Sequence, residues 1–266
     1  MKKAKKYNHP AINEVASHSA RLIELNHELE EKNRQLQQSE QARKSMFSNV
    51  THDLRAPVAA IRGAAERLCT DGISDEERRK MLKIIDSRAD VLDRLVGDLY
   101  FSMLVEQPEF CLVSSCLEIV PVLEEYFISM VGAGRLDDRD SRLNVPDGFS
   151  ARTMIDPQHF LRVLDNLLLN AVRHTKMGDV IELGCQKNGD FIEIYLRDSG
   201  TGIPADDLPK LFNHTFTGEG PRTPGKSGSG LGLSIAKSIV EKHNGSIRCH
   251  SVYGQGATFI VSLPMV

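Results

Sequence analysis

Hydrophobic residues recur every seven positions along the first part of the chain. The members of this repeat are Val15, Leu22, Leu29 and Leu36 at one position, with Ile12, Asn26 and Asn33 three residues earlier. Such a repeat predicts a parallel two-stranded coiled coil, because supercoiled helices bury one stripe of this spacing. Asparagines at the second core position cost stability, but they fix the register when they pair across two chains, which favours a dimer. A lone surface helix is the alternative interpretation.

The same frame continues without a break to about Thr70. It places Phe47, Leu54, Ile61 and Leu68 at one position, and Val50, Pro57 and Ala64 at the other. Asp71-Gly72 then marks a turn, and Ser74 followed by Glu77 predicts a capping box that opens a second helix. The apolar stripe of this helix comprises Met81, Ile84, Ile85, Leu92, Leu95, Val96 and Leu99. Two helices joined by a short turn predict a helical hairpin that forms a four-helix bundle with a second copy.

Beyond Pro108 short apolar runs alternate with helical periods, which predicts a domain boundary near residue 108. The expected helices cover residues 115–131, the segment that Asp156 caps and Pro157 opens, and residues 230–243. The expected strands are Leu143–Val145, Ile181–Cys185, Phe191–Leu196, Ser246–Ser251 and Ala257–Leu263, and a loop rich in Gly, Pro and Ser covers 213–229. This order predicts an α/β sandwich with a mixed sheet.

Composition restricts the function classes. The 33 Lys and Arg residues nearly balance the 36 Asp and Glu residues, and a net charge of -3 argues against a nucleic-acid partner. The basic cluster at residues 2–6 is interpreted as a solvated tail, with a juxtamembrane segment as the alternative. No run of about eighteen apolar residues is present, so we expect no membrane span in this chain, although it is compatible with a role beside a membrane sensor. Five cysteines without a CxxC pair predict a reduced, cytoplasmic protein.

The first candidate for chemistry is His52, in the segment FSNVTHDLRAPVAAIRGAAERL. The repeat places His52 on the outer face of the helix, and Ala56 and Ala59 lie over the same face, so no bulky side chain shields the imidazole. An exposed neutral imidazole is a competent nucleophile toward a phosphoryl group. Pro57 is expected to bend the helix beside His52, since it lacks the amide hydrogen.

The string HDLRAP after a coiled coil resembles the phosphoacceptor box of sensor histidine kinases. The resemblance implies that His52 is phosphorylated and that Asp53 orients it and accepts its proton. Many members of the family carry Thr or Asn where this chain has Ala56, and that side chain is thought to position the water that hydrolyses the partner's phospho-aspartate. The resemblance therefore leaves phosphatase activity in doubt.

A second candidate is DPQHFLRVLDNLLLNAVRHT, residues 156–175. It combines an apolar stripe with a polar one whose members are His159, Arg162, Asn166, Asn170 and Arg173. Asparagine is a poor residue for a helix interior, so two of them four residues apart call for an explanation beyond solvation. The string resembles the N box of the same family. By that resemblance Asn166 and Asn170 lie in the ATP site, Asn170 ligates Mg²⁺, Arg173 meets phosphate and His174 packs near the base.

Two glycine-rich segments complete the resemblance. LRDSGTGIP follows an expected strand, where Asp198 can accept a hydrogen bond from an adenine amino group, while Gly200 and Gly202 let the backbone approach a ligand. GSGLGLS precedes a helix whose free amides suit phosphate. It matches the second glycine box through Gly228, Gly230, Leu231 and Gly232.

The segment GPRTPGKS, residues 220–227, also satisfies the Walker A pattern. We interpret this match as a coincidence, because a P-loop follows a buried strand and opens a helix at its lysine, whereas two prolines stiffen this segment. Lys226 is expected to be a residue of the lid over ATP that touches phosphate. Thr215 and Thr217 depart from the Phe and Arg that the family's lid often carries.

The resemblance covers residues 45–263, with four boxes in the order and spacing of the family. It implies a coiled-coil signalling helix (1–44), a dimerisation and histidine phosphotransfer domain (45–108) and an ATP-binding catalytic domain (109–266). The implied function is autophosphorylation of His52 from Mg-ATP, followed by transfer to an aspartate of a response regulator receiver domain, in a homodimer. A pseudokinase that only scaffolds, and a non-kinase ATPase of the gyrase or mismatch-repair type, are the rival readings.

Overall fold

The structure is a computed structural model that describes residues 10–105, 107, 109–213 and 230–266. It divides into two compact units, residues 1–48 and 49–266. The long helix α1 (Pro10–Leu68) begins in the first unit, as the seven-residue repeat predicts, and continues through Pro57 without interruption. In the first unit the leucines of the repeat are exposed: Leu22 is 63% exposed, Leu29 60% and Leu36 65%. No described helix is long and apolar enough to cross a membrane.

The second unit begins with a helical hairpin, formed by the end of α1 and by α2 (Asp75–Val105). The predicted capping box at the start of α2 is confirmed: Glu77 N donates to Ser74 Oγ at 3.2 Å, and Ser74 N donates to Glu77 Oε2 at 3.3 Å. Along α1, Val50, Pro57 and Ala64 are buried, whereas the other row of the repeat, Leu54, Ile61 and Leu68, is only half-buried. A single hairpin therefore leaves one apolar row partly open to water.

The expected helix over 115–131 is wrong at its start. Ser115–Glu118 form strand β1, which pairs antiparallel with β3 (Arg152–Ile155), and helix α3 covers Ile119–Gly132. The sequence did not reveal β3, because a strand of four residues is too short to show its alternation clearly. The expected strand at 143–145 is displaced, since β2 covers Asp140–Asn144.

A five-stranded mixed sheet forms the centre of the part of the second unit that follows the hairpin, in the order β2-β4-β5-β7-β6. Its other strands are β4 (Val180–Asn188), β5 (Phe191–Asp198), β6 (Ser246–Ser251) and β7 (Ala257–Pro264). Only the β2–β4 pair among these described strands is parallel. The expected strands at 181–185, 191–196, 246–251 and 257–263 are confirmed with small extensions.

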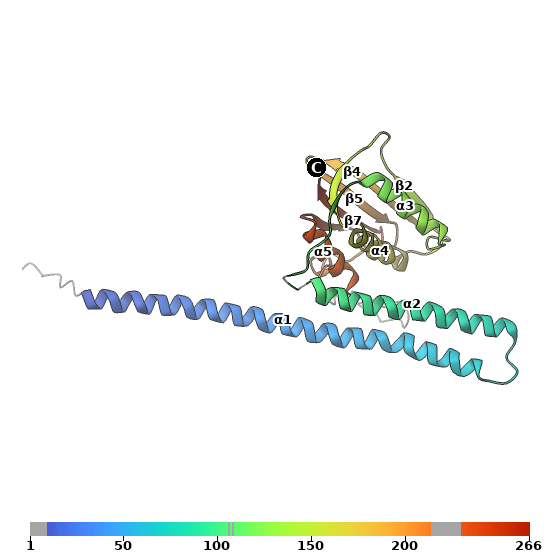
Figure 1. The fold of residues 1–266 in the computed structure, drawn as a ribbon, viewed down its shortest axis with the longest axis horizontal. Helices are drawn as coiled ribbons and strands as arrows, with labels where there is room; N and C mark the ends of the chain where they lie inside the picture. Colours follow the sequence, from blue (N-terminus) through green and yellow to red (C-terminus); the bar gives the residue numbers. More distant parts are fainter. Residues whose placement is uncertain (1–9, 106, 108, 214–229) are drawn as a thin grey trace, which may run out of the picture. The chain divides into compact units, whose positions relative to one another are not determined.

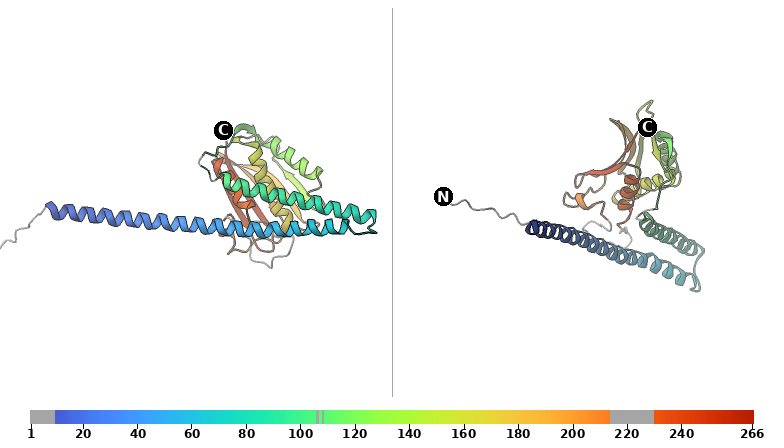
Figure 2. Two further views of the ribbon diagram at one scale, coloured as in Figure 1. Left: turned by 60° about the horizontal axis from the view of Figure 1, so that its bottom comes forward. Right: turned by 60° about the vertical axis from the view of Figure 1, so that its left-hand side comes forward.

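Helices α3, α4 (Pro157–His174) and α5 (Gly232–Lys242) lie over one face of this sheet (Figures 1 and 2). The apolar stripe of α4 is buried as predicted, with Phe160, Leu164 and Leu167 at most 1% exposed. Ile192, Ile194 and Leu196 of β5 are buried to the same degree, because alternate residues of a strand point to one face. This core holds the ends of α4, β5 and α5 in fixed relative positions, and these ends carry the candidate site residues.

Candidate functional site

His52 lies on α1 with 58% of its side chain exposed, as the repeat predicts. Its Nδ1 is 3.4 Å from Oδ1 of Asp53, whose side chain is 15% exposed. A proton on Nδ1 that faces this carboxylate leaves the lone pair on Nε2, which is the form of imidazole that attacks an electrophile. Ala56 and Ala59 are both exposed, so the helix face around His52 is open.

Helix α4 begins where the sequence predicts it. Asp156 is the N-cap, and its Oδ1 accepts a hydrogen bond from His159 N at 3.2 Å, with Pro157 in the first turn. The backbone amide of Asp156 donates to Nε2 of the buried His243 at 2.9 Å, while Nδ1 of His243 lies 2.8 Å from the carbonyl of Ile239. This places the proton on Nδ1, and burial lowers the pKa of His243, which keeps the ring neutral. The start of α4 is thus fixed to the end of α5.

The polar stripe of α4 divides into two parts. Arg162 donates from Nη2 to Oδ1 of Asp98 at 2.7 Å and lies over the ring of Phe101, so it contacts the end of α2. His159 also packs against Phe101, with ring centroids 5.3 Å apart. Asn166 and Asn170 lie one and two turns further along the helix from Arg162. The stripe in the sequence looks uniform, and nothing in its pattern distinguishes the two parts.

Asn166 lies against the start of α5. It is 9% exposed, and its Oδ1 would be 3.2 Å from a Cβ added at Gly232, the first residue of α5. Its Nδ2 is buried and has no hydrogen-bond partner among the described residues. A buried amide donor without an acceptor costs free energy, so this atom indicates that a bound ligand supplies the acceptor.

Asp198, at the end of β5, is 3% exposed and accepts a hydrogen bond from Gly200 N at 2.9 Å. Burial raises the pKa of this carboxyl, although the Gly200 and Ala257 amides oppose the shift. The loop after Asp198 contacts the end of α4, where Thr201 N donates to the carbonyl of His174 at 3.2 Å. A Cβ at Gly200 would collide with that same carbonyl.

Position 202 requires glycine for two reasons: its φ is +65°, and a Cβ there would collide with the carbonyl of Val252. The predicted residues of the first glycine box therefore meet the end of the N-box helix, and Asn166 meets Gly232 of the second box. Gly230, Leu231 and Gly232 directly precede or open α5, and Leu231 is fully buried. Arg173 and His174 are exposed at the end of α4.

Several predicted residues lie outside the described part of the chain. They are Lys226 and Gly228, together with the lid positions Thr215 and Thr217 and the segment 220–227. Within the described residues, no group of three or more His, Cys, Asp or Glu side chains could hold a metal ion. A metal at this site would therefore depend on ligands such as the amide of Asn170 and the oxygens of a bound phosphate.

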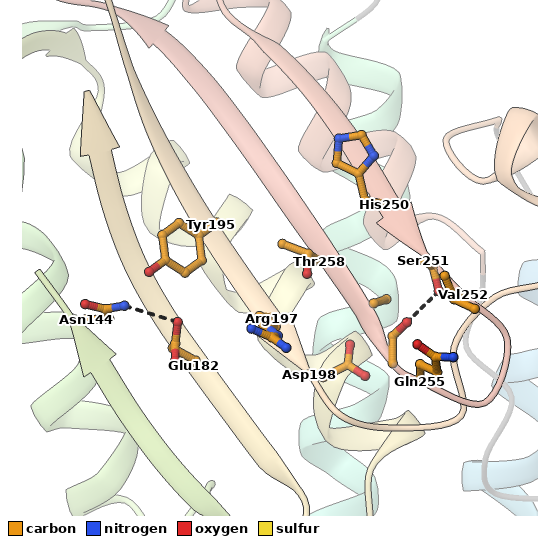
Figure 3. A pocket seen from close by; sticks show the side chains of 12 residues that line it. Asn144, Glu182, Tyr195, Arg197, Asp198, His250, Ser251, Val252, Gln255 and Thr258 are labelled. Atoms are coloured by element: carbon orange, nitrogen blue, oxygen red, sulfur yellow. Dashed lines mark hydrogen bonds between the residues drawn. The ribbon is translucent and has the colours of Figure 1, made fainter. Parts of the chain in front are cut away.

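A hollow of about 520 Å³ lies on the opposite face of the sheet (Figure 3). Tyr195 and Arg197 line it, and they alternate with the buried Ile194 and Leu196, which point to the helices. Glu182 joins them on this face and accepts a hydrogen bond from Asn144 Nδ2 at 3.4 Å. Of the predicted site residues in the described part of the chain, only Asp198 lines this hollow.

Two family models match the chain. Residues 42–107 match the His Kinase A (phospho-acceptor) domain, and residues 155–266 match the histidine kinase-, DNA gyrase B- and HSP90-like ATPase. The chain is 34% identical over 229 residues to the sensor protein SrrB of Staphylococcus aureus. That match includes 85% of this chain and 38% of SrrB, so the chain spans well under half the length of this relative.

The solved structures of similar fold include histidine kinases. The Acinetobacter baumannii histidine kinase AdeS is 21% identical, with a TM-score of 0.61 over 80% of this chain and 98% of that chain. The histidine kinase ThkA, solved in complex with the response regulator protein TrrA, is 24% identical, with a TM-score of 0.63 over 83% of this chain and 61% of that chain. At these identities the likeness shows the fold.

Proposed function

Because the chain belongs to the sensor histidine kinases, with a phospho-acceptor domain followed by an ATPase domain, we propose that it autophosphorylates His52 from Mg-ATP. The observation that carries the proposal is the open imidazole of His52 beside Asp53, on the same chain as a site with an unpartnered buried amide at Asn166. Neither feature alone requires a kinase. Together they supply an accessible nucleophile and a candidate nucleotide site, which are the two parts that phosphoryl transfer to histidine requires.

The nucleotide site is proposed to use residues from three elements. Asp198 would accept a hydrogen bond from the adenine amino group, and the glycines at 200 and 202 would keep the base close to the backbone. Nδ2 of Asn166 would donate a hydrogen bond to the nucleotide, which supplies the missing acceptor. Gly228, Gly230, Leu231 and Gly232 would form the second glycine box, where the amides at the start of α5 favour phosphate. Lys226, Arg173 and His174 are proposed to contact the nucleotide as well.

Mg²⁺ fits a site of this kind, because it keeps water and phosphate oxygens and needs few protein ligands. Asn170 is the proposed protein ligand. When bound, the ion would neutralise charge on the phosphates. His52 would then donate its Nε2 lone pair to the terminal phosphorus as the bond from that phosphorus to the bridging oxygen breaks and ADP leaves, while Asp53 holds the imidazole in orientation and accepts its Nδ1 proton.

The proposed partners follow from the same assignment. The phosphoryl group on His52 would pass to an aspartate of a response regulator receiver domain, and the complex of ThkA with TrrA supports a partner of this class. The half-buried row of Leu54, Ile61 and Leu68 supports a homodimer through the hairpin. We propose the domain limits 1–44, 45–108 and 109–266 for the coiled-coil helix, the phosphotransfer domain and the ATP-binding domain.

Substitutions in the site test this assignment against the Walker A match. We expect Asn170→Asp to abolish or severely impair use of Mg-ATP, because a carboxylate alters the charge where the metal and phosphates meet. Asp198→Asn should weaken nucleotide binding strongly, since the amide nitrogen no longer accepts from adenine. Lys226→Ala should leave substantial autophosphorylation. Nucleotide titration and phosphate labelling of the three variants measure these effects, and loss of activity only in Lys226→Ala would favour the P-loop reading.

A further inference from the structure

The buried part of α2 belongs structurally to the ATP-binding domain. Among the described residues of α2, the four buried ones are Asp98, Phe101, Ser102 and Val105. All four follow Gly97, whereas the preceding positions of the helix are exposed or half-buried, including Asp93 and Val96. The environment of this helix therefore changes at Gly97.

An ion pair between the buried Asp98 and the half-buried Arg162 joins the end of α2 to the N-box helix. Nη2 of Arg162 donates to Oδ1 of Asp98 at 2.7 Å, and the two side chains are 28% and 9% exposed. The guanidinium also stacks over the Phe101 ring, with Cζ 4.6 Å from its centroid. Removing Arg162 would leave the buried Asp98 carboxylate without its charged partner, and this pair also has an aromatic contact that a simple surface pair lacks.

The segment after α2 is fixed to the same body. The Phe110 ring lies 5.7 Å from those of Phe101 and His159, with Nζ of Lys242 5.3 Å from the Phe110 centroid. Further on, Val113 N donates to Oδ2 of Asp156 at 2.9 Å. The described part of this connection thus has anchors on α4 and α5, and it is no free tether between two domains.

Gly97 is the residue at which α2 can most easily bend. Glycine weakens the interior of a helix relative to alanine, because it has more backbone freedom to lose. No close neighbour requires glycine here, since an added Cβ would meet only Nη2 of Arg162, at 4.0 Å. The steric reasons that explain Gly200 and Gly202 are absent at this position.

We infer that Gly97 is the hinge between the hairpin and the ATP-binding domain, and that residues 98–105 move with the ATP-binding domain as one body. This inference rests on the proposed function. Among the described residues His52 has no hydrogen bond to the ATP-binding domain, and most of its side chain is exposed. Phosphoryl transfer requires the terminal phosphate of ATP to reach His52, and bending at Gly97 would let the ATP-binding domain move relative to the hairpin while Asp98 and Arg162 keep their contact.

The kinetic test compares Gly97→Ala with Gly63→Ala. Gly63 lies inside α1 with no atom within 4 Å of an added Cβ, so both changes stiffen a helix of the hairpin without a clash. Gly97→Ala should lower the autophosphorylation rate at saturating ATP roughly threefold to fivefold, with the KM for ATP unchanged, because only the approach to His52 is affected. Gly63→Ala should match the wild-type rate. Equal rates for the two variants, or a changed KM in Gly97→Ala, would overturn the inference.

Hydrogen exchange tests the hinge without relying on kinase activity. Amides of residues 91–97 should exchange faster than those of 99–105, and Gly97→Ala should slow the first group only. Asp98→Asn should speed exchange of 99–105, while Asp93→Asn, an exposed position on the same helix, should not. Uniform exchange along α2 would contradict the hinge. Absence of phosphohistidine in the wild type would instead contradict the proposed function and leave the exchange result to decide on the hinge.

Discussion

At the scale of single residues, the environment of each side chain determines its chemical role. His52 and Asp53 stand on an open helix face, where an imidazole can meet an incoming phosphoryl group. Asp198 and Asn166 are almost fully buried, where a carboxylate and an unpartnered amide gain most from a bound nucleotide. The proposed nucleophile is therefore accessible, and the proposed nucleotide contacts are desolvated.

Ala56 provides a prediction at this scale. Alanine has no polar atom to orient a water, so the chain should hydrolyse the phospho-aspartate of its partner slowly. Ala56→Asn should raise that hydrolysis roughly tenfold or more, because holding a water in line is mainly a matter of position. Ala59→Asn is the matched control, since Ala59 is also exposed on α1. The measurement is decay of phosphorylated partner with ADP, and rapid decay with the unmodified chain would contradict the role assigned to Ala56.

At the scale of elements, a polar network stabilises the outer face of the sheet. Glu193 of β5 has a side chain only 4% exposed and accepts hydrogen bonds from Gln186, Asn188 and Arg248, at 2.9, 2.6 and 2.6 Å. These donors, with Arg248 first, lower the pKa of Glu193 to about 2. The network joins β4, β5 and β6 across a face that no described helix covers.

The shifted pKa of Glu193 predicts a pH dependence of stability. Its folded pKa lies below the ordinary value of 4.5, so the stabilisation is fully present above pH 4.5 and is lost as the pH falls toward 2. Glu193→Gln should lower the free energy of unfolding by roughly 2 kcal/mol at pH 7, and by less as the pH falls through this range. Urea unfolding at several pH values measures the difference. Glu241→Gln, an exposed control, should have little effect, and a pH-independent loss in Glu193→Gln would contradict the account.

The elements also show what the sequence could predict. The sequence predicts α1, α2, α4 and the strands β4 to β7, because the apolar residues of these segments repeat over several helical turns or strand alternations. The pair β1–β3 could not be predicted, since each strand has four residues and depends on pairing between segments far apart in the chain. Likewise, the contact of Arg162 with Asp98 joins residues 64 positions apart, and no local pattern reveals it.

At the scale of the whole molecule, the apolar rows of the helices predict assembly. Leu29 and Leu36 are 60% and 65% exposed in a single chain, at the core positions of the seven-residue repeat. Pairing two chains would bury both, and the hydrophobic gain should be large enough to hold a dimer.

Sedimentation should therefore show a dimer at micromolar concentration. Leu29→Glu combined with Leu36→Glu should weaken the dimer strongly, because it places like charges at a buried seam. Lys32→Glu, outside the repeat, serves as the control and should remain dimeric. A monomeric unmodified chain at micromolar concentration would contradict the assembly.

The most direct test of the central proposal is the chemical identity of the phosphorylated residue. The chain should be incubated with Mg²⁺ and ATP labelled on its γ-phosphate, and the bound label treated with acid and with base. We expect label that is lost in acid, is stable in base and is absent from His52→Gln, because a phosphoramidate on imidazole has these properties. Label that survives acid, or that remains in His52→Gln, would contradict the assignment of His52 as the phosphoacceptor.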